Sequence, residues 1–225
     1  RMEIIAVTTG AIESIAGVDQ QVVYETEHFN FSEAINLGRT VASGSYLLIL
    51  NDDTCTSRRN SVTALVEVGQ IEGVGAVGAK LTYPDGRLQH VGIIMLPDGP
   101  THPFIGQSSK TPGYFGSTLT PRNFSAVTAA AMLVRSDAFD AVGGFDVQFA
   151  RDFNDVDFCL RLQQAGYRIA WTPYAHFTHH EGASMARRHP DRDEATRFAD
   201  RWQVGVDPFY SPALNQALQR MFEAS

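Results

Sequence analysis

The chain lacks the features that mark disulfide-rich, membrane-spanning and nucleic-acid-binding proteins. Its 225 residues include two cysteines, Cys55 and Cys159, which are too few for a disulfide framework and fit no zinc motif. No run of eighteen apolar residues occurs, so we expect no membrane span in this chain. Acidic residues outnumber basic ones, 25 to 18, and the formal net charge of −7 argues against nucleic acid as a partner. Two reduced thiols are typical of a cytoplasmic protein.

What remains is the composition of an ordinary globular domain. Hydrophobic residues make up 44% of the chain and charged residues 19%, and the length suits one domain with at most a short appendage. We expect one domain over residues 1–205 and a helical appendage over 206–225, in which 212–222 form an amphipathic helix. The chain begins directly on an apolar run at residues 4–7, which suggests a piece of a longer polypeptide.

Strand-like and helix-like segments alternate along the chain. Apolar runs predict strands at 3–8, 21–24, 46–50, 74–81, 126–134 and 168–172. Helical spacing predicts a helix at 32–42 with Ser32 as its N-cap and a second helix that begins after an N-cap at Ser57. It also predicts helices at 155–165 and 191–202. The stretch 97–123 has no periodicity and is expected to be a long loop. The alternation predicts an α/β fold with a mostly parallel sheet covered on both faces, where ligands bind at the carboxyl ends of strands.

An acidic group follows the apolar strand at 46–50. Asn51, Asp52 and Asp53 stand where that strand ends. Adjacent carboxylates raise each other's pKa or recruit a cation, and hard oxygen ligands suit Mg²⁺ or Mn²⁺. The alternative is a solvated turn whose aspartate caps the next helix. The tripeptide alone favours neither interpretation.

Two further groups carry candidate chemistry. Asp155 and Asp157 open a helix, where the positive end of the helix dipole stabilises carboxylates. His179 and His180 come later, and histidine is a common metal ligand. Aspartates at a helix start and a histidine pair at the surface are each also ordinary structural features, so the argument depends on their combination.

The order of these groups resembles glycosyltransferase family 2, the inverting enzymes of the GT-A fold in bacterial polysaccharide synthesis, including rhamnosyltransferases. The resemblance covers residues 3 to about 188. The segments that carry it are Phe29–Asn36, Ala42–Thr54, Ala126–Ala131, Gly143–Asp146, Phe153–Leu162 and Trp171–His180. It implies a Rossmann-like three-layer α/β/α sandwich. The family has another strand and helix before residue 3, so we expect the fold to be truncated at its N-terminus.

The resemblance implies a metal site that binds the donor diphosphate. Asp53 is the expected main ligand of Mn²⁺ or Mg²⁺, supported by Asp52. His179 is the first choice for the histidine that completes the site, and His180 the second. The donor would be a UDP-, dTDP- or GDP-linked sugar.

The resemblance also assigns the remaining site residues. Asp155 matches the catalytic base that takes a proton from the acceptor hydroxyl, and Asp157 would orient the acceptor or the loop. Asn36 and Arg39 lie where the family's helix approaches the nucleotide, and Ala130 would line the donor-sugar pocket. The acceptor would be a glycan or a lipid-linked glycan, which would put the protein at the inner face of the membrane.

A second function remains open. In the family the strand that corresponds to 3–8 ends in an aspartate, whereas this chain continues as Thr8-Thr9-Gly10-Ala11. A non-catalytic glycosyltransferase-like module, which binds a glycan or other domains of a longer polypeptide, is therefore the alternative to an enzyme. A metal-dependent phosphohydrolase or nucleotidyltransferase is a third and weaker possibility, since such enzymes also place acids at strand ends.

Overall fold

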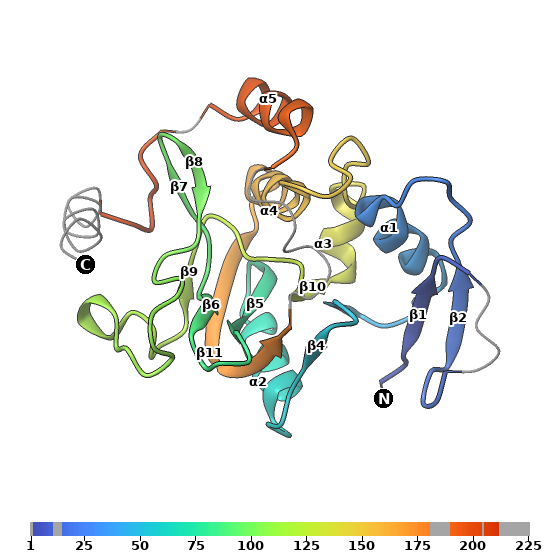
Figure 1. Ribbon diagram of the computed structural model, residues 1–225, viewed down its shortest axis with the longest axis horizontal. Coiled ribbons are helices and arrows are strands. Elements are labelled where there is room, and N and C mark those ends of the chain that lie inside the picture. The colour runs from blue at the N-terminus through green and yellow to red at the C-terminus, as the bar shows by residue number, and fades with distance from the viewer. Residues whose placement is uncertain (1, 11–14, 181–189, 204, 212–225) are drawn as a thin grey trace.

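The computed structural model describes residues 2–10, 15–180, 190–203 and 205–211, and it has the expected α/β architecture (Figure 1). Its central sheet has seven strands, with β3, β10, β5, β11 and β4 in spatial order and with β6 beside β5 and β9 beside β11. Their bounds are β3 Tyr46–Leu50, β4 Thr54–Cys55, β5 Val74–Thr82, β6 Leu88–His90, β9 Arg122–Asn123, β10 Ala131–Arg135 and β11 Arg168–His179.

The central sheet is mixed. β3 and β5 both pair antiparallel with β10, and β11 pairs parallel with β5. The three strands β3, β5 and β11 therefore run in the same direction, as the alternation predicts, with β10 reversed between β3 and β5. Because β3 and β11 share a direction, their carboxyl ends face the same edge of the sheet.

Helices cover both faces of this sheet. α2 (Ser61–Gly69) lies against β5, β10 and β11, while α3 (Ser136–Ala141) contacts β10 and α4 (Asn154–Gln164) contacts β11. All nine residues of β5 are buried. Within β5, the adjacent residues Ala76 and Val77 belong to two different apolar clusters, one on each face of the sheet. This two-sided burial explains why β5 reads as a continuous apolar run and not as an alternating one.

A separate two-stranded parallel sheet stands to one side of the molecule (Figure 1). It consists of β1 (Ile5–Thr8) and β2 (Gln20–Val23), and α1 (Phe31–Val41) packs against β1. The cap of α1 is Asn30, whose side chain accepts from the Glu33 N–H, so the prediction of Ser32 was wrong. Ser32 is completely buried inside the helix, and its hydroxyl donates to the Phe149 carbonyl instead.

Two other predicted boundaries differ from the structure. α2 begins after Asn60 and not after Ser57, because a turn that joins the Ser61 N–H to the Arg58 carbonyl precedes it. The last strand continues beyond residue 172 to His179, with a register shift between Thr172 and His176. Pro173 lies within this shift. Because proline has no N–H group, it cannot donate a hydrogen bond to the neighbouring strand.

The loop predicted at 97–123 has structure of its own. It contains part of a hairpin, β7 (Ile94–Leu96) and β8 (Gly99–Thr101), a 3₁₀ turn η1 (Tyr114–Gly116), and β9. α5 (Arg192–Arg201) follows near the end of the described chain. Beyond it, buried Asp207 accepts from the Met95 N–H at 2.6 Å, so the start of the predicted appendage packs on the domain. The helix predicted at 212–222 lies outside the described residues.

Candidate functional site

The acidic turn at the end of β3 is held in a fixed place by backbone hydrogen bonds. The Thr54 N–H donates to the Asn51 carbonyl at 3.1 Å, and the Asn51 N–H donates to the Ala130 carbonyl at 3.1 Å. The second bond continues the β3–β10 ladder beyond Leu50 and Ala131. The turn therefore extends from the sheet edge beside the segment 128–130, with Asp52 exposed and Asp53 partly covered.

The extension of β11 brings the histidines to this turn. β4 pairs antiparallel with the end of β11, so that His179 lies opposite Thr54. The Nε2 atom of His179 is 2.9 Å from Oδ1 of Asp53. The His180 N–H donates to the Asp53 carbonyl at 2.9 Å, while the His180 ring contacts the thiol of Cys55 at 3.7 Å. Of the two histidines, His179 is the one whose ring meets the carboxylate.

Gln89, on β6, orients the His179 ring. Its Oε1 lies 2.8 Å from Nδ1 of His179, and its side chain is buried. An amide oxygen accepts only, so Nδ1 carries the proton in this contact and Nε2 is the atom directed to Asp53. Sequence analysis did not single out Gln89, because a glutamine in a short strand carries no signal of its own.

The Asp53–His179 pair fits a divalent cation by the chemistry of its donors. A carboxylate and an imidazole whose other nitrogen is hydrogen-bonded form a common pair of ligands with an outer partner. Ligands at about 2.1 Å from Mg²⁺ in octahedral geometry are about 3 Å from one another, close to the 2.9 Å between the two atoms here. Within the described ranges no group of three or more His, Cys, Asp or Glu side chains is arranged around one point, so the protein would supply a partial set.

Asp155 lies at the start of α4, after a strained residue. Phe153 precedes the helix with φ 61°, a left-handed conformation that is costly for a bulky side chain. Stacking of its ring on Phe198 of α5, with centroids 4.8 Å apart, stabilises this conformation. Buried Glu194 of α5 also accepts from the N–H groups of Ala150 and Asp152, at 2.9 and 2.7 Å. α5 thus fixes the loop that delivers Asp155.

The environment of Asp155 favours its neutral form more than water does. Burial raises the pKa of this carboxyl group, and hydrogen bonds from the Thr128 side chain and the N–H groups of Ala129 and Val156 offset only part of that rise. The Ala129 N–H lies 3.2 Å from Oδ2 and the Val156 N–H 2.8 Å from Oδ1. A carboxylate that is held firmly and has a raised pKa is suited to accept a proton.

The segment 128–130 connects the two acidic groups. Ala129 donates its N–H to Asp155, and the next residue, Ala130, accepts from the Asn51 N–H. Residues 51–54 and the start of α4, about a hundred positions apart, therefore meet across three small residues. Ala130 itself is buried beside the turn.

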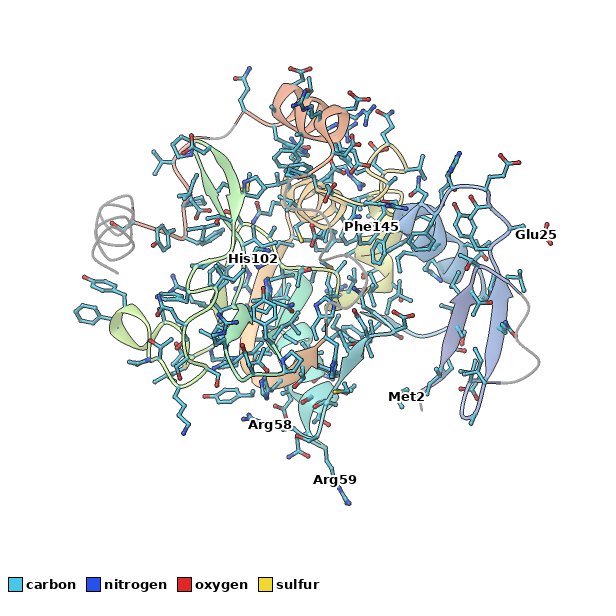
Figure 2. All side chains as sticks on the ribbon, in the orientation of Figure 1. Met2, Glu25, Arg58, Arg59, His102 and Phe145 are labelled. Atoms are coloured by element: carbon cyan, nitrogen blue, oxygen red, sulfur yellow. The ribbon has the colours of Figure 1, made fainter. Side chains whose placement is uncertain are left out.

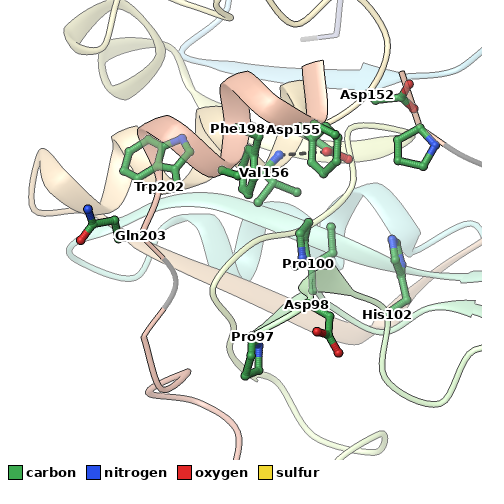
Figure 3. Close-up of a pocket in the computed structure, with 16 residues that line it drawn as sticks. Pro97, Asp98, Pro100, His102, Asp152, Asp155, Val156, Phe198, Trp202 and Gln203 are labelled. Carbon is green, nitrogen blue, oxygen red and sulfur yellow. Dashed lines mark hydrogen bonds between the residues drawn. The ribbon is translucent and has the colours of Figure 1, made fainter. Parts of the chain in front are cut away.

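A cavity of about 590 Å³ opens next to Asp155 (Figure 3). Figure 3 shows Asp98, Pro100 and His102 on the hairpin side of the cavity. Asp155, Val156, Phe198 of α5 and Trp202, which caps the end of α5, lie on the other side. The side chains of Figure 2 place His102 within the body of the molecule, whereas Arg58 and Arg59 extend outward before α2. Neither Asp53 nor His179 is among the described residues that line the cavity, so it adjoins Asp155 alone among the three.

Asp157 has the contacts of a structural residue. Its side chain is completely buried and accepts from Arg161 at 2.8 Å, from Arg201 at 2.9 Å and from the Trp202 indole at 2.9 Å. These bonds tie α4 to α5. Asn154 is buried beside it, and its side-chain amide donates to the Arg151 carbonyl.

Asn36 and Arg39 are also engaged within the fold. Asn36 exchanges two hydrogen bonds with the backbone of Phe145, at 2.8 and 2.9 Å. Arg39 forms an ion pair with Asp140 at 2.6 Å and donates to the Ala42 carbonyl. Both side chains join α1 to the α3 region, and their predicted contact with a nucleotide stays a prediction. Residues 181–189, which follow the histidine pair in the sequence, lie outside the described residues.

Comparisons with known proteins identify relatives of this chain. No protein-family model matches it. It is 35% identical to the uncharacterized protein y4gI of Sinorhizobium fredii, over 97% of the chain and 26% of that protein. It is also 35% identical to the O-antigen biosynthesis protein RfbC of Myxococcus xanthus, over 88% of the chain and 16% of that protein. An N-acetylglucosaminyl-diphospho-decaprenol L-rhamnosyltransferase of Mycobacterium tuberculosis is 33% identical over half of the chain.

Two solved structures that are similar to the structure of this chain are also glycosyltransferases. A mannosyltransferase from Pyrobaculum calidifontis, in complex with GDP-Man and Mn²⁺, matches 92% of the chain and 56% of its own length with a TM-score of 0.55 at 16% identity. GalNAc-T7 with UDP, GalNAc and Mn²⁺ matches 91% of the chain and 48% of its own length with a TM-score of 0.58 at 12% identity. At sequence identities this low, the structural similarity shows the fold alone. In the described part of the chain, no helix combines the length and apolar content needed to cross a bilayer. The chain spans 26% of the first of these sequence relatives and 16% of the second. The named sequence relatives and this fold place the chain among the family 2-like glycosyltransferases of the GT-A fold.

Proposed function

We propose that the chain is an inverting glycosyltransferase domain that moves a sugar from a nucleotide-diphosphate donor to a hydroxyl group of a glycan acceptor. The single observation that carries the proposal is the contact of Asp53 with His179 and its connection, through the segment 128–130, to Asp155. A cation site after the carboxyl end of β3 and a basic carboxylate at the start of α4 are the two parts that such a displacement needs.

The donor side of the site consists of Asp53 and His179, with exposed Asp52 beside them. These residues would hold Mn²⁺ or Mg²⁺, which when bound neutralises the charge that develops on the leaving diphosphate. Gln89 keeps the Nε2 atom of His179 directed to the site. Both structural relatives were solved with Mn²⁺ and a nucleotide or nucleotide sugar, which supports a divalent cation here.

The acceptor side consists of Asp155 and the adjoining cavity. Asp155 would accept the proton of the acceptor hydroxyl while that oxygen attacks the anomeric carbon and the bond to the diphosphate breaks. One such displacement inverts the configuration of the sugar. We assign Asp157 to the scaffold, because its carboxylate is occupied by Arg161, Arg201 and Trp202.

The names of the relatives indicate the class of product. O-antigen biosynthesis and rhamnosyl transfer to a lipid-linked sugar are the activities of two of them. We propose a UDP-, dTDP- or GDP-linked donor and a glycan or lipid-linked acceptor at the inner face of the membrane, within a longer polypeptide. The alternative, a non-catalytic module, is motivated by the end of β1, where the Thr8 hydroxyl donates to the Gly10 carbonyl and the sequence continues as Thr9 and Gly10 in place of the family's aspartate.

Calorimetry with UDP, GDP and dTDP in the presence of Mn²⁺ tests the donor side. We expect one nucleotide to bind the wild-type chain and to lose most of its affinity in Asp53→Ala. Asp200→Ala, which removes an exposed carboxylate from α5, is the matched control and should bind like the wild type. Equal nucleotide affinity in the Asp53→Ala variant and the wild type would refute the metal assignment. Binding without any sugar transfer to a glycan acceptor would favour the non-catalytic module.

A further inference from the structure

The cavity beside Asp155 has walls of two kinds. Its described lining residues include three carboxylates, Asp98, Asp152 and Asp155, and no lysine or arginine. The apolar lining includes Phe153, Phe198 and Trp202, and rings of this kind offer flat faces for stacking. A sugar ring has hydroxyl groups at its edge and apolar C–H groups on its faces, so it matches both kinds of wall. An anionic group would be repelled by the three carboxylates, and the described lining offers no lysine or arginine to offset that repulsion.

Three lining side chains carry nitrogen, and they belong to His102, Trp202 and Gln203. The Trp202 indole N–H donates to Asp157, and His102 is the one of the three on the hairpin side. His102 follows β8 and lines the cavity on its hairpin side (Figure 3). Its Nδ1 atom lies 3.1 Å from Nδ1 of His90, which is buried at the end of β6. Two facing ring nitrogens at this distance share one proton, so one ring donates and the other accepts.

Backbone contacts decide which ring donates. Nε2 of His90 accepts from the Gly92 N–H at 3.2 Å and from the Thr128 N–H at 3.4 Å, so this nitrogen carries no proton. Burial and the neighbouring His102 ring lower the pKa of His90 well below its usual range, which keeps the ring neutral. A neutral ring without a proton on Nε2 carries it on Nδ1. His90 therefore donates to His102, and the remaining proton of a neutral His102 is on Nε2.

The backbone at Gly92 makes this arrangement possible. Gly92 has φ 109°, and a Cβ atom there would lie 2.4 Å from the Phe124 ring. A larger residue would have to displace either the ring or the loop. The Thr128 N–H comes from the same three-residue segment whose next N–H holds Asp155, so the histidine pair and the proposed base are fixed by adjacent peptide groups.

We propose that this cavity binds an uncharged sugar ring of the acceptor and that His102 is a specificity-determining residue that donates its Nε2 proton to a sugar oxygen. His90 is a positioning residue, which fixes the tautomer of His102 without contacting the sugar. Asp98 and Asp152 accept from sugar hydroxyls and disfavour an anionic ring. The inference rests on the proposed function and names the class of acceptor.

Saturation-transfer NMR with methyl glycosides tests the chemistry of the cavity. The probes are the methyl glycosides of glucose, galactose, mannose, rhamnose and N-acetylglucosamine, each without charge, and the methyl glycosides of glucuronate and galacturonate. We expect at least one neutral glycoside to bind and both uronates to bind at least about tenfold more weakly, in line with about 1.4 kcal/mol per tenfold. Asp98→Asn should reduce the difference in affinity between the neutral glycosides and the uronates. Uronate binding as tight as that of the neutral sugars, or no glycoside binding at all, would overturn the inference.

Variants of His102 test the hydrogen bond. His102→Leu should weaken binding of the best neutral glycoside by about two- to tenfold, as expected for the loss of one neutral hydrogen bond. His102→Gln, which places an N–H near the position of Nε2, should recover most of that loss. An unchanged affinity in His102→Leu would exclude a contact with the sugar.

The role of His90 is tested on the wild-type chain, since a substitution of this buried residue can disturb folding. Long-range ¹⁵N–¹H NMR spectra at neutral pH should show the proton of His90 on Nδ1 and that of His102 on Nε2. The opposite tautomers would overturn the positioning role. Nucleotide binding with Mn²⁺ separates the two proposals: if it persists while no glycoside binds, only the acceptor inference fails, and if nucleotide binding is also absent, the proposed function fails.

Discussion

The two halves of the candidate site use the same residue type in opposite environments. Asp53, at the end of β3, keeps 33% of its side chain exposed and meets the ring of His179. Asp155 is held by two backbone N–H groups beside a cavity, and burial raises its pKa. A partly exposed carboxylate beside an imidazole is suited to bind a cation, and a desolvated one to accept a proton. The surroundings decide what each aspartate can do.

The same contrast recurs within α4. Asp155 faces the cavity, whereas Asp157, two residues later, is completely buried and bound by two arginines and an indole. The sequence presents them as one acidic motif. Helical geometry separates them, because positions two apart lie on different faces of a helix.

Substitution of Asp155 is expected to have the largest effect on activity. Asp155→Asn removes the base and should lower kcat/KM for sugar transfer by about 10²–10⁴-fold, the usual contribution of a general base. Nucleotide binding with Mn²⁺ should be unchanged, because the donor side is intact. A variant that loses nucleotide affinity as well would show that the two halves are not separable.

Substitution of Asp157 should instead affect stability. Asp157→Asn leaves Arg161 without its carboxylate partner, whereas Arg201 keeps its ion pair with Asp146 at 2.6 Å. Removal of one partner of a buried ion pair costs about 3–5 kcal/mol. We expect the lower end of that range, because the arginine side chains are 20% and 30% exposed. Urea denaturation measures the loss. Native stability with strongly reduced transfer would return Asp157 to the catalytic group.

Removal of the Gln89 side chain should weaken the cation site. Gln89→Leu leaves Nδ1 of His179 without its acceptor, and loss of such an outer partner typically costs 10–100-fold in metal affinity. Mn²⁺ binding, followed by electron paramagnetic resonance, gives the measurement. Gln89→Glu keeps an acceptor at Nδ1 and should retain more affinity than Gln89→Leu. Equal Mn²⁺ affinity in all three proteins would exclude an orienting role.

The pH dependence should be the smallest effect. Because burial raises the pKa of Asp155, its carboxyl stays protonated to a higher pH than an ordinary aspartate of about 3.9. Activity should therefore fall as the pH is lowered through this raised pKa. Ionisation of Asp155 is less favourable in the folded state, so its contribution to stability decreases as the pH rises through the same range. A rate profile whose acid limb lies at the ordinary aspartate pKa would contradict the desolvated environment.

Much of the fold is predictable from the sequence because local patterns and tertiary packing agree there. β3, β5, α1 and α4 appear within a few residues of their predicted positions, and the α/β class is confirmed. A strand at 126–134 was predicted, but the reversed direction of β10 and the short strands β8 and β9 were not. Strand direction and short pairings depend on partners far along the chain, and no local pattern encodes those partners.

The residues of the candidate site could be singled out from the sequence only in part, and their roles stay a prediction. Family resemblance singled out Asp53, His179 and Asp155, and the structure joins them through direct contacts and the segment 128–130. The contact of Gln89 with His179 depends on β6 packing in the sheet, and the contact of His90 with His102 forms because the chain folds back between β6 and β8. A glutamine and two histidines twelve residues apart gave no periodic signal, so only the three-dimensional arrangement reveals them.

The helix α5 has a consequence for how such proteins diversify. Its residue Phe198 and its C-cap Trp202 line one wall of the cavity, and through Glu194 it secures the loop ahead of Asp155. Asp53 and His179 depend instead on the sheet. On the proposed assignment of the two sides, a relative would acquire a new acceptor by exchange of this one short helix, while its nucleotide preference would stay the same.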